Sequence, residues 1–294
     1  MKNDEPTVGR RVLLRTAVFL GIAAASTLVT AGESQTPLPG TAGPAPAGGP
    51  PPAGAAGAPG LRPAGPPEKS YRLRPMTAEA PARPPLAKPA VRARPILGLP
   101  DDAAHASAMA LTFDDGPDPR YTPAILDTLA RYQVRATFFV CGEMATDNRD
   151  LLRRMVTEGH VIGNHTWTHP LIPKLGRPAL LSEIGRTSEV VQQTVGEPPL
   201  WFRAPYGAWN RAAFEIGADL GMEPLAWTLD TLDWKEPGTT AIVSRVQAGA
   251  GPGVIVLNHD AGGNRAQSVQ ALATYLPQLL ARGYRMTLPT LPPR

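Results

Sequence analysis

The stretch Ala108-Met-Ala-Leu-Thr-Phe-Asp-Asp-Gly-Pro117 joins an apolar run to two adjacent acids and a turn. The run 108–113 is typical of a buried strand, and the four residues after it favour a turn. Similar apolar runs recur downstream, with helical patterns between them, at 136–140, 161–163, 200–202, 225–229, 254–257 and 284–288. This alternation predicts an α/β fold with a parallel sheet covered by helices, and the number of units favours closure into a barrel.

The helical patterns carry their own start and stop signals. Thr122 is the predicted N-cap of the first helix, with Pro123 at its first position. Asp147 is the predicted N-cap of the second, and Pro178 begins the third. Pro277 lies inside the last helical pattern and is predicted to kink or split it. The remaining predicted helices cover 210–220, 239–246 and 267–282.

Acids and histidines follow the ends of the predicted strands. Asp114 and Asp115 follow the first, His165 and His169 the third, and His259 the sixth. Two histidines four residues apart present their rings from one face of a helix or turn, and one added carboxylate gives three Zn²⁺ ligands with a fourth position for water. Because barrel enzymes keep their active sites at the C-terminal ends of the strands, this pattern predicts a one-metal hydrolase.

Five motifs, in this order, resemble those of the polysaccharide deacetylases, the NodB-homology domain of carbohydrate esterase family four. The motifs are Thr112-Phe-Asp-Asp-Gly-Pro117, His165-Thr-Trp-Thr-His169, Arg203-Ala-Pro-Tyr-Gly207, Asp230-Thr-Leu-Asp-Trp234 and Leu257-Asn-His259. The resemblance covers roughly residues 104–294. It implies a distorted (β/α) barrel with seven or eight parallel strands.

The resemblance also implies a metal site. Zn²⁺, or another divalent ion such as Co²⁺, would be held by Asp115, His165 and His169, and Asp114 would act as the general base. Considered alone, each residue leaves another interpretation open. An Asp-Asp-Gly-Pro string also favours a simple turn, and a single histidine is more often structural than a ligand.

The resemblance gives His259 the role of general acid, with Asp233 raising its pKa. It pairs Arg203 with the Asp114 side of the site. A structural ion pair of Arg203 and Asp233 across the barrel mouth is the alternative, and it is compatible with the first interpretation.

Three further motif residues are implied to shape the substrate site. The backbone N–H of Tyr206 would hold the oxyanion, in a turn fixed by Pro205. Trp234 and Leu257 would wall the groove that receives the sugar or acetyl group. A Trp buried in the core is the alternative for Trp234.

We therefore expect a secreted, metal-dependent N-deacetylase that acts on an N-acetylglucosamine polymer such as peptidoglycan or chitin. An O-acetyl xylan esterase with the same site is the alternative within enzymes. A non-catalytic cell-wall-binding module is the alternative from another class.

The composition separates a folded part from an upstream segment. The 294 residues include 35 Pro and 29 Gly, concentrated before residue 100, and the net charge is +4. Eight Lys or Arg lie between Arg62 and Arg94, which favours attraction to an anionic cell envelope. Nucleic acid is not an expected partner, because the folded part has no basic stripe interleaved with aromatics.

Cys141, the single cysteine, is predicted to be a core residue, with a thiol near the metal pocket as the alternative.

Three segments are predicted along the chain. Residues 1–31 combine Arg10-Arg11 with an apolar stretch and small residues at 29–31, as in a signal peptide of the Sec or twin-arginine type or an uncleaved membrane anchor. Residues 32–100 are predicted to be a disordered Pro/Gly/Ala-rich linker, and 101–294 the deacetylase domain. We expect an exported monomer, secreted or associated with the cell envelope.

Overall fold

The computed structural model describes residues 87–293, so the predicted signal segment and residues 32–86 of the predicted linker lie outside it. The strands are β1 (Ala108–Asp114), β2 (Thr137–Val140), β3 (Val161–Asn164), β4 (Trp201–Phe202), β5 (Glu223–Pro224), β6 (Leu229–Asp230), β7 (Ile255–His259) and β8 (Arg285–Met286). The α-helices are α1 (Thr122–Arg131), α2 (Gly142–Asp147), α3 (Arg149–Thr157), α4 (Arg177–Val195), α5 (Arg211–Asp219), α6 (Thr239–Gly249) and α7 (Ala266–Ala281). Short 3₁₀ turns are η1 (Ala103–His105), η2 (Ile172–Lys174), η3 (Pro205–Gly207) and η4 (Asp233–Lys235).

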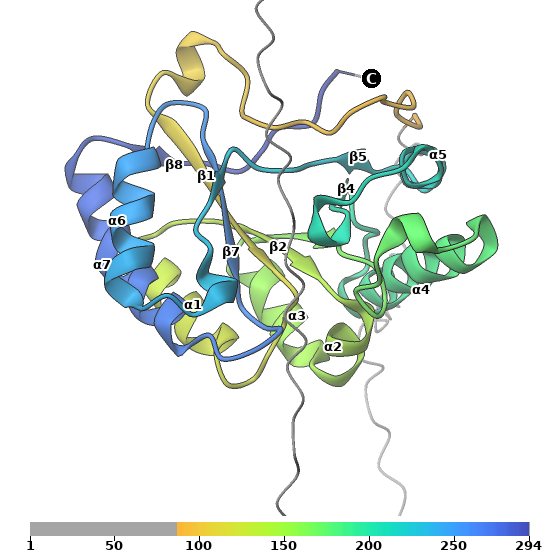
Figure 1. The fold of residues 1–294 in the computed structure, drawn as a ribbon, viewed down its shortest axis with the longest axis horizontal. Helices are drawn as coiled ribbons and strands as arrows, with labels where there is room; N and C mark the ends of the chain where they lie inside the picture. Colours follow the sequence, from red (N-terminus) through yellow and green to blue (C-terminus); the bar gives the residue numbers. More distant parts are fainter. Residues whose placement is uncertain (1–86, 294) are drawn as a thin grey trace, which may run out of the picture. The chain divides into compact units, whose positions relative to one another are not determined.

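All strand pairs are parallel, and the strands follow the order β5-β4-β3-β2-β1-β7-β6, with β8 paired to the start of β1. β1 is buried along its whole length because it lies between β2 and β7 and is covered on both faces. Figure 1 shows α1, α6 and α7 on one flank of the sheet and α2, α3 and α4 on the other. This curled, partly closed sheet confirms the predicted distorted (β/α) barrel.

The core is built from the apolar stripes that the sequence indicates. Ile125, Leu126 and Leu129 of α1 are fully buried against the sheet, together with Phe113 and Phe138, whose rings stack 5.1 Å apart. At roughly 25 cal/mol for each Å² of apolar surface removed from water, such side chains supply most of the stabilisation. The core therefore fixes the strand ends from which the candidate site residues project.

One strand prediction was wrong. The apolar run 225–229 is not one strand, because β5 ends just before it at Pro224 and β6 begins only at its last residue, Leu229. The chain leaves the sheet between them, with Leu225 and Ala226 buried against other groups. As a result, His259 ends the seventh strand, one later than predicted, although it still lies at a C-terminal strand end.

Several helix details also differ from the predictions. Tyr121 is the N-cap of α1, and Thr122 is already helical. Asp147 ends α2 rather than capping α3, which begins after Asn148. Helix α7 runs unbroken through Pro277, so the predicted split is absent from it. None of the described helices is long and apolar enough to cross a membrane.

The linker boundary at residue 100 is corrected by the segment 92–99, which packs on the barrel. Ile96 forms a parallel bridge with Leu225, and Leu99 N–H donates to the Gly253 carbonyl at 2.9 Å. The segment thus connects the end of β5 to the loop before β7. Arg92 donates to the buried carboxylate of Glu223 at 2.5 Å. The folded domain therefore includes residues 92–99.

We expect Leu99→Ala in the full chain to lower the free energy of unfolding by about 3 kcal/mol, as for other buried leucines. For a domain of this size, the melting temperature should fall by roughly 10 °C. Leu97→Ala is the matched control, because Leu97 is 53% exposed and Leu99 only 9%. Thermal unfolding of both variants measures the difference, and equal melting temperatures would show that the segment does not contribute to the fold.

Candidate active site

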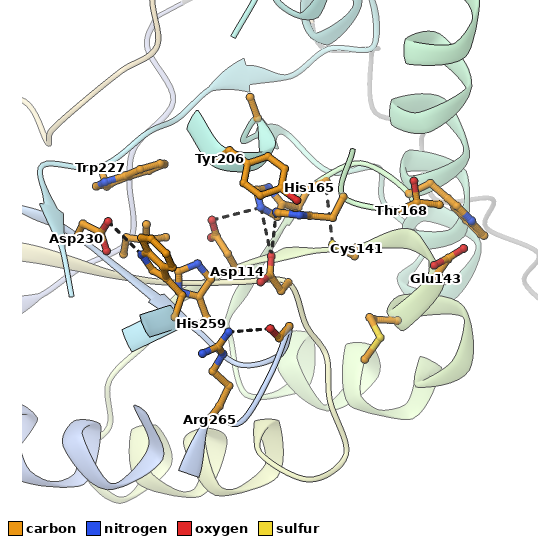
Figure 2. A pocket seen from close by; sticks show the side chains of 18 residues that line it. Asp114, Cys141, Glu143, His165, Thr168, Tyr206, Trp227, Asp230, His259 and Arg265 are labelled. Carbon is orange, nitrogen blue, oxygen red and sulfur yellow. Dashed lines mark hydrogen bonds and ion pairs between the residues drawn. The ribbon is translucent and has the colours of Figure 1, made fainter. Parts of the chain in front are cut away.

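The C-terminal ends of β1, β3, β6 and β7 surround a cavity of about 600 Å³. Figure 2 shows Asp114, His165, Tyr206 and His259 at its centre, with Trp227 and Asp230 toward one end and Glu143 toward the other. The strands meet here because parallel strands bring all their carboxyl ends to one side of the barrel.

The two adjacent acids have different backbone conformations at the end of β1. Asp114 completes the strand, and Asp115 adopts a left-handed backbone (φ 75°). Both carboxylates lie near His165 Nε2, at 3.5 Å from Asp114 Oδ2 and 3.6 Å from Asp115 Oδ1. Gly262 lies against the Asp115 carboxylate, since a Cβ at Gly262 would lie 2.3 Å from Oδ2. The acidic pair is thus not a simple surface turn.

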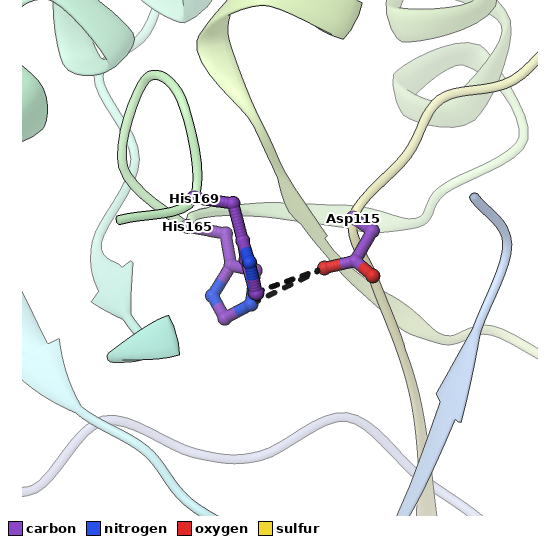
Figure 3. Close-up of side chains that lie close together, drawn as sticks. All are labelled: Asp115, His165 and His169. Atoms are coloured by element: carbon purple, nitrogen blue, oxygen red, sulfur yellow. Dashed lines mark ion pairs between the residues drawn. The ribbon is translucent and has the colours of Figure 1, made fainter. Parts of the chain in front are cut away.

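Asp115, His165 and His169 form a group whose ligand atoms all lie within 4.8 Å of one another (Figure 3). Nε2 of His165 and Nε2 of His169 lie 3.6 Å and 3.3 Å from Asp115 Oδ1. This Oδ1 is buried and has no hydrogen-bond partner within the described residues. The three residues therefore converge on one point with an unsatisfied carboxylate oxygen, an arrangement that suits a divalent cation.

The protonation state of His165 fits the role of a metal ligand. Its Nδ1 lies 2.8 Å from the Arg203 carbonyl, which can only accept, so Nδ1 carries the proton and the Nε2 lone pair faces the other two residues. Burial lowers the pKa of His165 to about 3, although the Asp115 charge acts in the opposite direction. A neutral imidazole is the form that binds a metal.

Asp114 is held by Arg203, as expected from the resemblance. The fully buried guanidinium of Arg203 donates to Asp114 Oδ1 at 2.6 Å, and it also donates to Thr112 Oγ1 and to the Leu225 and Ala226 carbonyls. Burial raises the pKa of Asp114, and the charges of Arg203 and His259 oppose this effect. Asp114 Oδ2 remains 3.5 Å from His165 Nε2, on the metal side of the pocket.

His259 and Asp233 form the second ion pair. His259 Nδ1 lies 2.7 Å from Asp233 Oδ1, and the His259 backbone N–H donates to Asp233 Oδ2 at 2.9 Å. Burial would lower the pKa of His259, but the hydrogen bond and charge of Asp233 outweigh burial and raise it to about 9. Arg203 pairs with Asp114 and Asp233 with His259, so the alternative of an Arg203 to Asp233 ion pair was wrong.

The predicted substrate-site residues divide into exposed and buried groups. Tyr206 is 68% exposed, with a left-handed backbone (φ 60°) after the buried Pro205, and its ring lies edge-on to His169 at 4.5 Å. Trp234 is 48% exposed and lines the cavity, so it is not a core residue. Leu257 lines the cavity floor and is almost fully buried.

Cys141 fits both interpretations offered for it. It is buried at the end of β2, and it also lines the cavity. Burial, helped by Asp115 and Asp114, raises the pKa of its thiol well above the usual value. The thiol therefore stays protonated and is a poor nucleophile.

Four residues around the site were missed in the sequence. Ser268 Oγ donates to Asp233 Oδ2 at 2.7 Å. The buried Arg265 donates to the carbonyls of Asp233, Ala261 and Gly262. Asp260 accepts a hydrogen bond from Thr122, and Glu183 contacts the histidine loop. None stands in a motif, and only the position of Asp260 beside His259 could have drawn attention to it.

Asp115, His165 and His169 converge in one cavity with Asp114 and His259, at the C-terminal ends of parallel strands, an arrangement typical of a hydrolase. The Polysaccharide deacetylase family matches residues 101–225. A chitooligosaccharide deacetylase of Sinorhizobium fredii is 38% identical over 197 residues, which cover 63% of this chain and 92% of the relative. This chain belongs to the polysaccharide deacetylase family and is a hydrolase of amide bonds.

Two similar solved structures differ in activity. A peptidoglycan N-acetylglucosamine deacetylase, solved in complex with 4-naphthalen-1-yl-N-oxidanyl-benzamide, has a TM-score of 0.62 and 35% identity, covering 65% of this chain and 88% of that chain. A family pseudoenzyme from Bacillus anthracis has a TM-score of 0.57 and 29% identity, covering 61% of this chain and 63% of that chain. The fold is therefore shared by a deacetylase and by a pseudoenzyme.

Proposed function

We propose that this protein is a metal-dependent N-deacetylase of N-acetylglucosamine polymers, with peptidoglycan or chitin as the substrate class. The observation that carries the proposal is that Asp114, paired with Arg203, and His259, paired with Asp233, line the same cavity as the Asp115, His165 and His169 group. Relatives named as chitooligosaccharide and peptidoglycan deacetylases support the substrate class.

The donor set favours Zn²⁺, although Co²⁺ suits the same two imidazoles and carboxylate. When bound, such an ion supplies a Lewis acid for the acetyl carbonyl and lowers the pKa of water toward about 7. Proton transfer and oxyanion binding are carried out by side-chain and backbone groups of the protein. Asp114, made more basic by burial, takes the proton from the attacking water.

His259 supplies the proton that the leaving nitrogen needs. Its pKa of about 9 keeps the imidazole charged at neutral pH, and Asp233 fixes its orientation. The backbone N–H of Tyr206 is proposed to hold the developing oxyanion, a contribution typically worth about 3 kcal/mol. Leaving alcohols can also use an acid, so His259 alone does not exclude the O-acetyl xylan alternative.

The exposed aromatic rings suit a carbohydrate chain. Tyr206 and Trp234 line the cavity, and the cavity extends to both sides of the catalytic centre (Figure 2). Sugar faces pack well on such rings because the C–H groups are apolar. We propose that Trp234 and Tyr206 contact sugar rings, while Leu257 contacts the acetyl group.

We further propose that the protein is exported and works as a monomer at the cell envelope. The N-terminal apolar stretch and the basic residues 62–94 support this location. The upstream segment would act as a spacer that lets the domain reach an acetylated polymer.

Acetate release by the purified full-length chain tests the proposal. N-acetylglucosamine oligomers, peptidoglycan and acetylated xylan are compared with and without EDTA, followed by return of Zn²⁺ or Co²⁺. We expect release from the first two, loss of activity with EDTA, and recovery with metal. Release from xylan alone would identify an esterase, and no release from any substrate would favour a wall-binding pseudoenzyme.

A further inference from the structure

The loop 165–169 that carries both histidines has an unfavourable backbone. Thr166 (φ 68°) and His169 (φ 58°) adopt left-handed conformations, although neither is glycine. Such residues typically cost about 1–3 kcal/mol each and persist only where surrounding contacts hold them. The separation of His165 and His169 therefore depends on groups outside the loop.

Glu183 on α4 supplies the most direct of these contacts. One carboxylate oxygen, Oε2, accepts the backbone N–H groups of Trp167 and Thr168, both at 2.8 Å. The other, Oε1, accepts the Thr168 hydroxyl at 3.0 Å. Hydrogen bonds to an ionised carboxylate are roughly twice as strong as neutral ones.

The rest of the loop is held by neighbouring elements. Asn164 Oδ1 accepts the Thr166 N–H at 2.9 Å, while Asn164 Nδ2 donates to the Ile184 carbonyl at 2.7 Å. On the other side, Gly142 N–H donates to the Thr166 carbonyl at 2.9 Å. The loop is thus clamped between α2 and α4, and Glu183 binds its middle.

We propose that Glu183 is a positioning residue for the metal site: it fixes the loop so that His165 and His169 converge on Asp115. The proposal rests on the metal dependence proposed above. Glu183 does not line the cavity, so it acts through the loop and not on substrate. Losing it leaves two backbone N–H groups without their acceptor and lets the histidines separate.

Zinc affinity of the full chain, stripped of metal and titrated against a competing chelator, tests this role. We expect Glu183→Ala to weaken zinc binding by about 10- to 100-fold, the usual effect of removing an outer-shell partner. The zinc affinity of Glu183→Gln should lie between those of the wild type and Glu183→Ala, because the one carbonyl oxygen of glutamine can still accept a hydrogen bond. The matched control is Glu189→Ala, since Glu189 is an exposed residue of the same helix whose side chain makes no hydrogen bond among the described contacts. Saturating zinc should restore most of the turnover of Glu183→Ala.

A second readout does not require metal. Amide hydrogen exchange at Trp167 and Thr168 should be faster in metal-free Glu183→Ala than in the wild type or Glu189→Ala. If the wild type binds zinc and Glu183→Ala binds it with the same affinity, the positioning role of Glu183 is overturned, while the proposed function stands. Equal losses in both alanine variants would assign the effect to helix stability and also overturn it. A wild type that binds no zinc would remove the metal site itself and this proposal with it.

Discussion

Asp114→Asn should lower kcat about 10³-fold or more and leave zinc bound with near-normal affinity. The substitution keeps the shape of the side chain but removes the general base, whose usual contribution is about 10²- to 10⁴-fold. Asp114 is not among the three converging ligands, so the metal should stay. Acetate release and metal content, measured on the same sample, separate the two effects.

The same substitution removes the ionic partner of the buried Arg203, and the fold must therefore be checked. Arg203 retains Thr112 Oγ1 and the carbonyls of Leu225 and Ala226 as acceptors, so we expect a folded protein with a lower melting temperature. His165→Ala is the contrasting variant, because it should lose both metal and activity. Near-normal turnover in both variants would show that the site is assigned wrongly.

The sequence predicted the parts of this site that local patterns encode. The apolar run 108–113 became β1, and the spacing of His165 and His169 placed both rings beside Asp115. Tyr206 and Trp234 line the cavity, and Arg203 pairs with Asp114, as the family resemblance implied. For these three residues the prediction came from the motifs of the family and not from periodicity.

The groups that hold these residues in place could not be predicted in the same way. Ser268 and Glu183 lie on helices, far along the chain from the loops they contact, and nothing in their local sequence distinguishes them from other polar helix residues. The bounds of β5 and β6 were missed because the apolar run 225–229 covers the buried segment between the two strands and not the strands themselves. Segment 92–99 was assigned to the linker because its Pro and Arg content hides the two apolar contacts, Ile96 and Leu99.

Asp233→Asn should shift the alkaline limb of the pH profile of kcat/KM toward acid by about 2.5 pH units or more and lower activity at pH 7 by about fourfold or more. The pKa of His259 is raised to about 9 in the presence of Asp233. The protonated, active form is therefore fully present at neutral pH and is lost as the pH rises through 9. Without the carboxylate, burial dominates and the pKa falls toward or below the ordinary value of 6.5. The general acid is then mostly deprotonated at neutral pH.

Ser268→Ala is the control for this shift, because it removes one hydrogen bond to Asp233 Oδ2 but leaves the charge beside His259. We expect its alkaline limb to move by less than about 0.5 pH units, since the charge of Asp233 persists. Profiles of acetate release between pH 5 and 10, recorded at saturating zinc, compare the three proteins. An alkaline limb that stays at the same pH in Asp233→Asn would assign it to a group other than His259. The ion pair would then have an orienting role, and another residue would have to donate the proton to the leaving nitrogen.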